Sequence, residues 1–262
     1  MALKTPIINI MTKAAYKAGN ILIKDFREVE NLQVSKKGIG DFVTSSDLNS
    51  EKTIIKILEK AYPEIKVISE ETNPETDLDN HEKKWIIDPL DGTLNFIHGL
   101  PHFAISIALM IKEEIISGII YDPIKDELFW AEKGVGAYLN DRRIRVSARN
   151  QLKDALVSTG IPWKGMEETH KNYLKILENI MKNSSGIRRY GAAALDLAYV
   201  ASGRYDGYWH REINYWDIAA GLILVKESGG FVESLNSNGF LEKKIDIIAT
   251  NSKIHKELRN LL

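Results

Sequence analysis

The chain has 262 residues, of which 44% are hydrophobic and 27% are charged, as is typical of a soluble globular protein. Its length fits one large α/β or α+β domain or two fused halves. The 35 basic and 36 acidic residues give a net charge of −1, so no basic excess points to nucleic acid or an anionic membrane. Cysteine is absent, which excludes disulfides and thiol chemistry and fits a reducing compartment.

The first segment, residues 5–28, is predicted to form an amphipathic helix. Its apolar residues, among them Ile8, Met11, Ala15 and Ala18, recur at helical spacing. The segment lacks the charged start, long apolar core and cleavage site of a secretory signal. No window approaches the ~18 unbroken apolar residues of a membrane span. We therefore expect a cytoplasmic protein that does not enter a membrane.

The remainder of the first half predicts a loop, a helix and closely spaced strands. The stretch "VSKKGIGDFVT" (34–44) is predicted to be a loop, and a helix is predicted over 46–62. Short strands fit residues 65–69 and 84–88. Four more strand-like runs follow at short intervals and predict an antiparallel meander: 103–111, 114–122, 126–132 and 136–140.

The second half alternates predicted strands and helices. Strands are expected over 155–160, 205–210 and 245–250. Helices are expected over four ranges: 167–182, 191–203, 217–228 and 252–262. This order predicts helices and sheets in layers, in a single domain of residues 1–262. Its two halves, about 1–150 and 151–262, would meet near residue 150.

Acidic side chains occupy conspicuous places in the predicted elements. Asp88 directly continues an apolar strand, where a carboxylate is costly unless it is paired, hydrogen-bonded or bound to metal. Asp91 follows three residues later, before a glycine and a predicted helix start. Asp47 and Asp217 have a simpler interpretation, since each lies next to a predicted helix start and an acidic residue there caps or supports the helix.

Several carboxylates without a matching basic cluster predict bound cations. The oxygen donors are Asp41 and Asp47, Glu70 and Glu71, Asp88 and Asp91, and Asp217, and there is no cysteine. Such a set suits Mg²⁺ or Mn²⁺ rather than Zn²⁺. Backbone N–H groups of Gly92 and Thr93, at a helix start, would suit a phosphate. Metal and phosphate together predict phosphoryl chemistry.

Four blocks of the sequence resemble the inositol monophosphatase family, especially its bacterial branch. They lie in the family's order and spacing between residues 37 and 230: "KGIGDFVTSSDLNSE", "ISEET", "WIIDPLDGTLNFIHGLP" and "YWDIAAGLILVKESGG". The stretch "GIRRYGAAALDLAYVASGRYDGYW" (186–209) resembles the family's substrate-side segment. The resemblance implies an α+β fold, the layered α-β-α-β-α sandwich of the inositol monophosphatase and fructose-1,6-bisphosphatase superfamily. It also implies a homodimer and inhibition by Li⁺.

The resemblance assigns two to three Mg²⁺ ions to this chain, with Mn²⁺ as a possible replacement. Glu70, Asp88 and the Leu90 carbonyl would hold the first ion. Asp88, Asp91 and Asp217 would hold the second ion. Glu70 would also help to place a third, more weakly held ion through waters, which gives it a catalytic as well as a metal-binding role.

The resemblance also implies how the reactants are held. Asp47 and Thr93 would orient and help to deprotonate the attacking water. The N–H groups of Gly92 and Thr93 would hold phosphate oxygens, and the Ala193 N–H would contact a sugar hydroxyl. The substrate would be a small phosphorylated polyol.

One position departs from the family pattern. Many members have a glutamate seven residues before the last metal-binding aspartate, where it accepts hydrogen bonds from inositol hydroxyls. Here that position is His210, and we expect it to meet the substrate itself. Alternatively, Glu212 would replace the missing carboxylate, because positions two apart share a face in an extended segment.

The sequence therefore predicts a Mg²⁺-dependent phosphomonoesterase that converts inositol 1-phosphate and water into inositol and phosphate. The alternatives are another small ester, namely fructose 1,6-bisphosphate, adenosine 3′,5′-bisphosphate or histidinol phosphate. Arg188, Arg189 and Arg211 are candidates for contacting a nucleotide. A different class of function is a partner-binding, regulatory role in transcription or RNA machinery.

Overall fold

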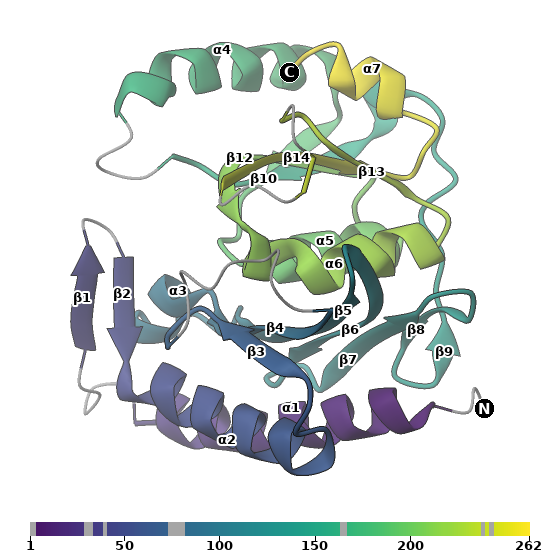
Figure 1. Cartoon of the computed structure of the whole chain (residues 1–262). Coiled ribbons are helices and arrows are strands. Elements are labelled where there is room, and N and C mark those ends of the chain that lie inside the picture. Colours follow the sequence, from purple (N-terminus) through teal and green to yellow (C-terminus); the bar gives the residue numbers. More distant parts are fainter. Residues whose placement is uncertain are drawn as a thin grey trace.

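Five layers stack in the computed structural model, which describes residues 4–28, 34–38, 41–72, 82–162, 167–236, 239–240 and 244–262. Helices α1 (Pro6–Phe26) and α2 (Ser45–Ala61) cover one face of a seven-stranded sheet (Figure 1). Helices α5 (Ala193–Ala201) and α6 (Tyr215–Glu227) separate that sheet from a five-stranded one. Two outer helices cover the second sheet: α4 (Glu167–Asn183) and α7 (His255–Arg259). This is the α-β-α-β-α sandwich that the family resemblance implies.

The seven-stranded sheet has its strands in chain order, from β3 to β9. Strand β3 runs parallel to β4, and every later pair is antiparallel, so the predicted meander is confirmed. The two-residue strand β9 was not predicted because it is too short to show a period. The strands are β3 (Lys66–Ser69), β4 (Lys83–Asp91), β5 (Ala104–Ile111), β6 (Glu114–Asp122), β7 (Glu127–Glu132), β8 (Gly136–Leu139) and β9 (Arg142–Arg143).

The five-stranded sheet has the order β11-β10-β12-β14-β13. Strand β10 pairs in parallel with β11 and β12, and the other pairs are antiparallel. The strands predicted from sequence correspond to β10, β12 and β14, whereas the three- and four-residue strands β11 and β13 were not predicted. Their bounds are β10 (Leu156–Thr159), β11 (Gly186–Arg188), β12 (Gly207–Asn214), β13 (Phe231–Ser234) and β14 (Lys244–Thr250).

The loop predicted over residues 34–44 is wrong. Strands β1 (Val34–Gly38) and β2 (Asp41–Thr44) pair there as an antiparallel hairpin with an irregular register after Lys36. Two glycines and two lysines interrupt the apolar residues of this stretch, so its sequence shows no clear two-residue period. Pairing between the two short strands, rather than a hydrophobic pattern, defines the hairpin.

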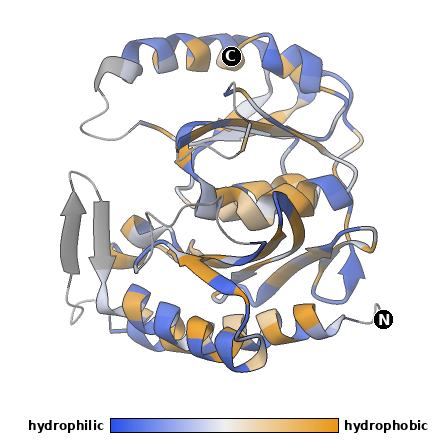
Figure 2. Ribbon diagram, viewed as in Figure 1, coloured by the Kyte–Doolittle hydropathy of each residue, from blue (hydrophilic) through white to orange (hydrophobic). Residues whose placement is uncertain are grey.

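Each interface between layers has its own hydrophobic core. One cluster lies between α1, α2 and the seven-stranded sheet, a second surrounds α5 and α6, and a third lies under α4 and α7. Both central helices are predominantly hydrophobic (Figure 2), and all nine residues of α5 are buried. A helix that is apolar all round belongs in an interior. The first turns of these two central helices are therefore held firmly, and both contribute to the site described below.

No helix in the described part of the chain is long and apolar enough to cross a membrane.

Candidate active site

A bulge at the end of β4 sets the positions of Asp88 and Asp91. Asp88 pairs with Ser106 and Asp91 with Ala104, so three steps along β4 face two steps along β5. The extra residue falls at Pro89 or Leu90, and proline suits this place because it has no N–H to leave unpaired. The Leu90 N–H donates to Asp88 Oδ1 at 3.0 Å, which fixes that carboxylate.

Three carboxylates converge from separate elements. One oxygen each of Glu70, Asp88 and Asp217 lies within 4.8 Å of the others, the one such group in the described ranges. Glu70 follows β3, Asp88 belongs to β4, and Asp217 lies in the first turn of α6. Like charges at this separation repel strongly unless a proton or a cation lies between them. The convergence was predicted from the sequence and is present in the fold.

Burial and mutual repulsion both disfavour the ionised forms of these groups. Burial raises the pKa of Asp88 well above its usual range, and the charges of Glu70, Asp91 and Asp217 add to the shift. Burial likewise raises the pKa of Asp217 to about 6, although the Lys244 ammonium partly offsets this. An all-oxygen set of close, buried carboxylates is what a hard dication such as Mg²⁺ relieves. The residues present therefore fit the predicted metal.

Asp91 connects the metal side of the site to α5. Its two carboxylate oxygens accept the N–H groups of Ala193 at 3.2 Å and Ala194 at 2.8 Å. These are the first N–H groups of a buried helix, where negative charge is favoured. The Ala193 N–H, which was predicted to contact a sugar hydroxyl, is therefore engaged by Asp91, and a substrate oxygen would have to share it.

Asp47 and Thr93 form the predicted pair. Thr93 Oγ1 lies 3.0 Å from Asp47 Oδ1 and 3.1 Å from the Leu90 carbonyl, so its single proton has two alternative acceptors. Asp47 Oδ2 accepts from the Thr44 N–H at 2.9 Å in a capping box that begins α2. The helix-supporting role of Asp47 is confirmed, and its second oxygen still faces Thr93. Burial raises the pKa of Asp47, against the hydrogen bonds of Thr44 and Thr93.

The N-cap interpretation of Asp217 is wrong. Helix α6 begins at Tyr215, so its N-cap is Asn214, and Asp217 lies in the first turn. The Asn214 Nδ2 atom lies 3.4 Å from Asp217 Oδ2. The N-cap lies three residues upstream of the predicted position. Strand β12 extends to Asn214, four residues beyond the end predicted for it, and α6 follows directly. Asp217 is thereby left directed toward Asp88 and Glu70.

Gly92 is required by its backbone and by its neighbours. It has φ 94°, in the left-handed region, and it is the N-cap of the short helix α3 (Thr93–Ile97). A Cβ there would lie 3.1 Å from the His102 carbonyl and 3.3 Å from the Gly191 carbonyl. Glycine therefore allows the chain to turn sharply beside Asp91. That the N–H groups of Gly92 and Thr93 hold phosphate stays a prediction.

Two of the acidic residues described above line a cavity of about 130 Å³. Asp91 and Asp217 contribute to its wall, and so do Gly160, Arg189 and His210 from the second half of the chain. His210, the position that departs from the family pattern, therefore shares a cavity with two predicted metal ligands.

The expectation that Glu212 shares a face with His210 is wrong. Strand β12 has an irregular register between His210 and Ile213, and Glu212 has φ 55°, so the two-residue alternation is interrupted. The Glu212 N–H donates to Asp246 at 2.8 Å, whereas Ile213 lines the cavity.

Of the three arginines named as candidates, Arg189 lines the cavity. Arg211 instead pairs with Asp246 at 2.5 Å and also donates to the Leu262 carbonyl. Arg188, at the end of β11, is exposed and is not among the lining residues.

Asp196 is a cavity-lining carboxyl that sequence analysis missed. It lies in α5 and is 2% exposed, and its Oδ1 has no hydrogen-bond partner among the described residues. Burial raises its pKa well above the usual range. The sequence carried a signal, since "ALDLAYVA" places one carboxylate in an otherwise apolar helix.

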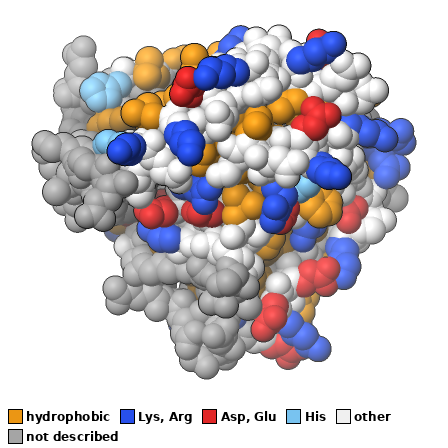
Figure 3. Space-filling view, turned by 90° about the horizontal axis from the view of Figure 1, so that it is seen from above, with side chains coloured by type: hydrophobic (Ala, Val, Ile, Leu, Met, Phe, Trp, Pro, Cys, Tyr) orange, Lys and Arg blue, Asp and Glu red, His pale blue; other side chains and the backbone are white. Residues whose placement is uncertain are grey.

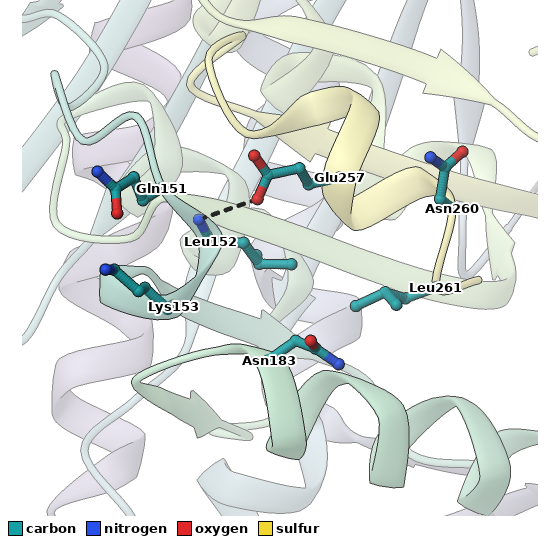
Figure 4. A pocket seen from close by; sticks show the side chains of 7 residues that line it. All are labelled: Gln151, Leu152, Lys153, Asn183, Glu257, Asn260 and Leu261. Carbon is teal, nitrogen blue, oxygen red and sulfur yellow. Dashed lines mark hydrogen bonds between the residues drawn. The ribbon is translucent and has the colours of Figure 1, made fainter.

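A larger cavity, of about 440 Å³, lies elsewhere, between the 3-10 turn at Leu152–Asp154 and helix α7 (Figure 4). Glu257 is the only carboxylate among its lining residues, and it accepts the Leu152 N–H at 3.3 Å. This cavity brings together no acidic pair and no catalytic dyad. The smaller, carboxylate-lined cavity is the candidate active site.

Comparison with known proteins agrees with this geometry. The sequence profile of the inositol monophosphatase family matches residues 3–262. Inositol-1-monophosphatase of Rhizobium meliloti is 46% identical over 259 residues, 99% of this chain and 97% of that protein. Nus factor SuhB of Pseudomonas aeruginosa is 43% identical over 256 residues, 97% of this chain and 94% of that protein. The crystal structure of extragenic suppressor protein suhB from Bartonella henselae superposes with a TM-score of 0.91, at 47% identity over 98% of both chains. The chain belongs to the inositol monophosphatase family.

Proposed function

We propose that this phosphatase is a Mg²⁺-dependent phosphomonoesterase that hydrolyses inositol 1-phosphate to inositol and phosphate. The observation that carries the proposal is the convergence of Glu70, Asp88 and Asp217 within 4.8 Å. The Asp47–Thr93 pair supports it, since Thr93 Oγ1 also lies 3.1 Å from the carbonyl of the predicted ligand Leu90. A cation site and a proton acceptor in one place are the two requirements of metal-assisted ester hydrolysis.

Five residues would hold the metal ions. Glu70, Asp88 and the Leu90 carbonyl are proposed for one ion, and Asp88, Asp91 and Asp217 for another, with Glu70 also serving a third. When bound, the dications supply positive charge and Lewis acidity to the phosphoryl group. The Leu90 carbonyl is already next to Thr93, so metal binding and the Asp47–Thr93 pair are adjacent.

The chain's own groups would move the proton and hold the ester. Thr93 Oγ1 would accept a proton from the attacking water while passing its own proton to Asp47 Oδ1, 3.0 Å away. Burial favours a protonated Asp47, which makes it a better proton acceptor than an exposed aspartate. The N–H groups of Gly92 and Thr93 would hold phosphate oxygens, and Ala193 and His210 would contact the alcohol part of the substrate.

The size of the cavity favours a small ester. Its volume of about 130 Å³ lies below the roughly 300–1,000 Å³ of pockets that enclose drug-sized ligands. Arg211, one candidate for a nucleotide contact, is occupied by Asp246.

Phosphate release from inositol 1-phosphate, with Mg²⁺ and with EDTA, tests the proposal. We expect release with Mg²⁺ and none with EDTA, and Mn²⁺ should substitute in part. Hydrolysis of 4-nitrophenyl phosphate but not of inositol 1-phosphate would retain the mechanism and reject the substrate. Equal release of phosphate in EDTA would reject the metal dependence.

A partner-binding role is the second candidate, and the relatives named Nus factor SuhB favour it. Basic and acidic side chains are interspersed on the face seen in Figure 3, without a visible basic stripe for nucleic acid. A protein partner therefore fits that face better than a direct contact with RNA. A cell that retains its normal phenotype with Asp88→Asn, but not without the protein, would support this role.

A homodimer is proposed from the family resemblance. Light scattering should then give a mass near twice the 29.6 kDa of the chain. A mass of one chain at the concentration of the assay would reject it.

A further inference from the structure

The ring of His210 occupies a space that exists only because residue 160 is glycine. Thr159 and Trp209 pair in the parallel strands β10 and β12, so Gly160 and His210 follow side by side. A Cβ on Gly160 would lie 2.1 Å from both Cε1 and Nε2 of the ring. The φ angle of Gly160 is outside the left-handed region, so its backbone would accept an L-residue. The three atoms nearest to such a Cβ all belong to the imidazole, so the ring is what requires glycine here.

The Tyr208 hydroxyl determines which ring nitrogen carries the proton. Its oxygen lies 2.7 Å from His210 Nδ1, and the Tyr208 side chain is fully buried. A buried hydroxyl needs an acceptor for its hydrogen, and Nδ1 is the partner within reach, so we assign this hydrogen bond as a donation from the hydroxyl to Nδ1. A neutral imidazole then carries its one hydrogen on Nε2. Burial lowers the pKa of His210 to about 4, with help from the Arg189 charge, so the ring is neutral near pH 7.

The Nε2 atom of His210 lies against Gly160, at the wall of the cavity. It has no hydrogen-bond partner among the described residues, and His210 lines the same cavity as Asp91 and Asp217. Arg189 lines that cavity too, and its guanidinium is close enough to act on the His210 pKa. Two other carboxyls lie in this region. Burial favours the neutral form of Asp196, whereas Asp246 lies outside the cavity lining and is paired with Arg211. The cavity therefore has an acidic, metal-binding end and an end that offers hydrogen-bond donors.

We infer that Gly160 and Tyr208 hold His210 as a hydrogen-bond donor to the leaving group, so that the site favours phosphate esters carrying a second oxyanion. Arg189 would add positive charge beside that donor. The second oxyanion is a phosphate or a carboxylate, because hydrogen bonds to either are about twice as strong as bonds to a neutral hydroxyl. The inference rests on the proposed phosphatase site and ranks esters of this class ahead of inositol 1-phosphate among its substrates.

The test compares esters that differ in the leaving group. We would measure kcat/KM with Mg²⁺ for inositol 1-phosphate, fructose 1,6-bisphosphate and 3-phosphoglycerate, and express the last two relative to the first. His210→Glu replaces a donor with an anion and should lower at least one ratio roughly tenfold or more. His210→Gln keeps an N–H donor and should keep that ratio within about threefold of the wild type. The ester whose ratio falls identifies the oxyanion, and two unchanged ratios in His210→Glu would overturn the inference.

A pair of glycine variants tests the ring's position. Gly160→Ala should displace the ring and lower the same ratio, and combining it with His210→Ala should lower the ratio no further. Gly186→Ala is the matched control, since it lies in the same sheet and its Cβ would meet Leu156 Cδ1 at an ordinary 3.4 Å. If Gly160→Ala keeps the wild-type ratio of kcat/KM values, the position of the His210 ring does not determine which ester is preferred.

The tautomer can be measured without turnover. Nitrogen-15 NMR of the metal-free protein near pH 7, with the His210 signals assigned from His210→Gln, should show a protonated Nε2 and an unprotonated Nδ1. The opposite tautomer would overturn the inference whatever the kinetics. If no ester, 4-nitrophenyl phosphate included, is hydrolysed with Mg²⁺, the proposed function fails, and the tautomer still decides whether His210 is a donor.

Discussion

The metal side and the substrate side of the site are held in different ways. On the metal side, backbone N–H groups support the carboxylates: Leu90 donates to Asp88, Thr44 donates to Asp47, and two residues of α5 donate to Asp91. On the substrate side, a single ring fills the space above Gly160 and one hydroxyl orients it.

This difference shows which half of the site tolerates change. Backbone donors remain in place whatever the neighbouring side chains are, so the carboxylates keep their geometry as long as the fold is intact. The position of His210 depends on two other side-chain positions, 160 and 208, and any of the three can alter it. We expect the reaction to depend on the metal side and the choice of substrate to depend on the other side.

Removing a central carboxylate should have the largest effect. Asp88→Asn takes a ligand from both proposed metal ions, so kcat should fall by more than the ~10–100-fold typical of losing an outer-shell partner. Steady-state phosphate release with saturating Mg²⁺ measures this. Because the substitution also removes a repelling charge, the metal-free variant should melt at a higher temperature than the wild type. Near-normal turnover would refute the assignment of Asp88.

Removing the Thr93 hydroxyl should have a smaller effect on the same rate. Thr93→Ala breaks the path from the attacking water to Asp47 and should lower kcat by roughly 10²–10⁴-fold, as for the loss of a general base. Thr93→Ser keeps the hydroxyl and is the control, which should retain most of the activity. Equal losses in both variants would show that the methyl group, or the helix start, matters instead of the proton path.

Two glycines separate backbone strain from function. Gly92 and Gly99 both have positive φ angles, of 94° and 68°, so alanine at either should destabilise the protein by about 1 kcal/mol. Only at Gly92 would the new Cβ meet neighbours, the nearest at 3.1 Å. Thermal melts should shift for both variants, whereas kcat should fall severalfold for Gly92→Ala alone. A similar loss of activity in Gly99→Ala would remove the special role of Gly92.

The pH dependence of stability should be a smaller effect. Burial raises the folded-state pKa of Asp217 to about 6, from 3.8, so from about pH 4 to 6 the folded metal-free protein binds more protons than the unfolded chain. Its contribution to the free energy of unfolding therefore falls as pH rises. Asp217→Asn lacks this ionisation, so its advantage in Tm over the wild type should grow across that range. A constant difference between the two would contradict the raised pKa.

Local patterns in the sequence predicted most of the fold and the metal side. The layered order of elements, the meander and the carboxylates at the strand end of β4 all have short-range signatures. The bulge in β12 was not predictable, because the left-handed Glu212 leaves no trace in residue type. The contact between Gly160 and His210 depends on which strands pair, 50 residues apart in the chain. The start of α6 was predicted two residues late, which left Asp217 with an unneeded capping role.

The most direct test is the binding of Mg²⁺ to the wild type and to Asp88→Asn. Binding is monitored as the change in Tm while Mg²⁺ is added near neutral pH. It needs no substrate, so it examines the metal cluster separately from the choice of ester. Ligand binding to the folded state alone raises Tm with concentration. We predict a rise for the wild type and for Thr93→Ala, and little or none for Asp88→Asn. An equal rise in Asp88→Asn would contradict the central claim that Glu70, Asp88 and Asp217 form the metal site.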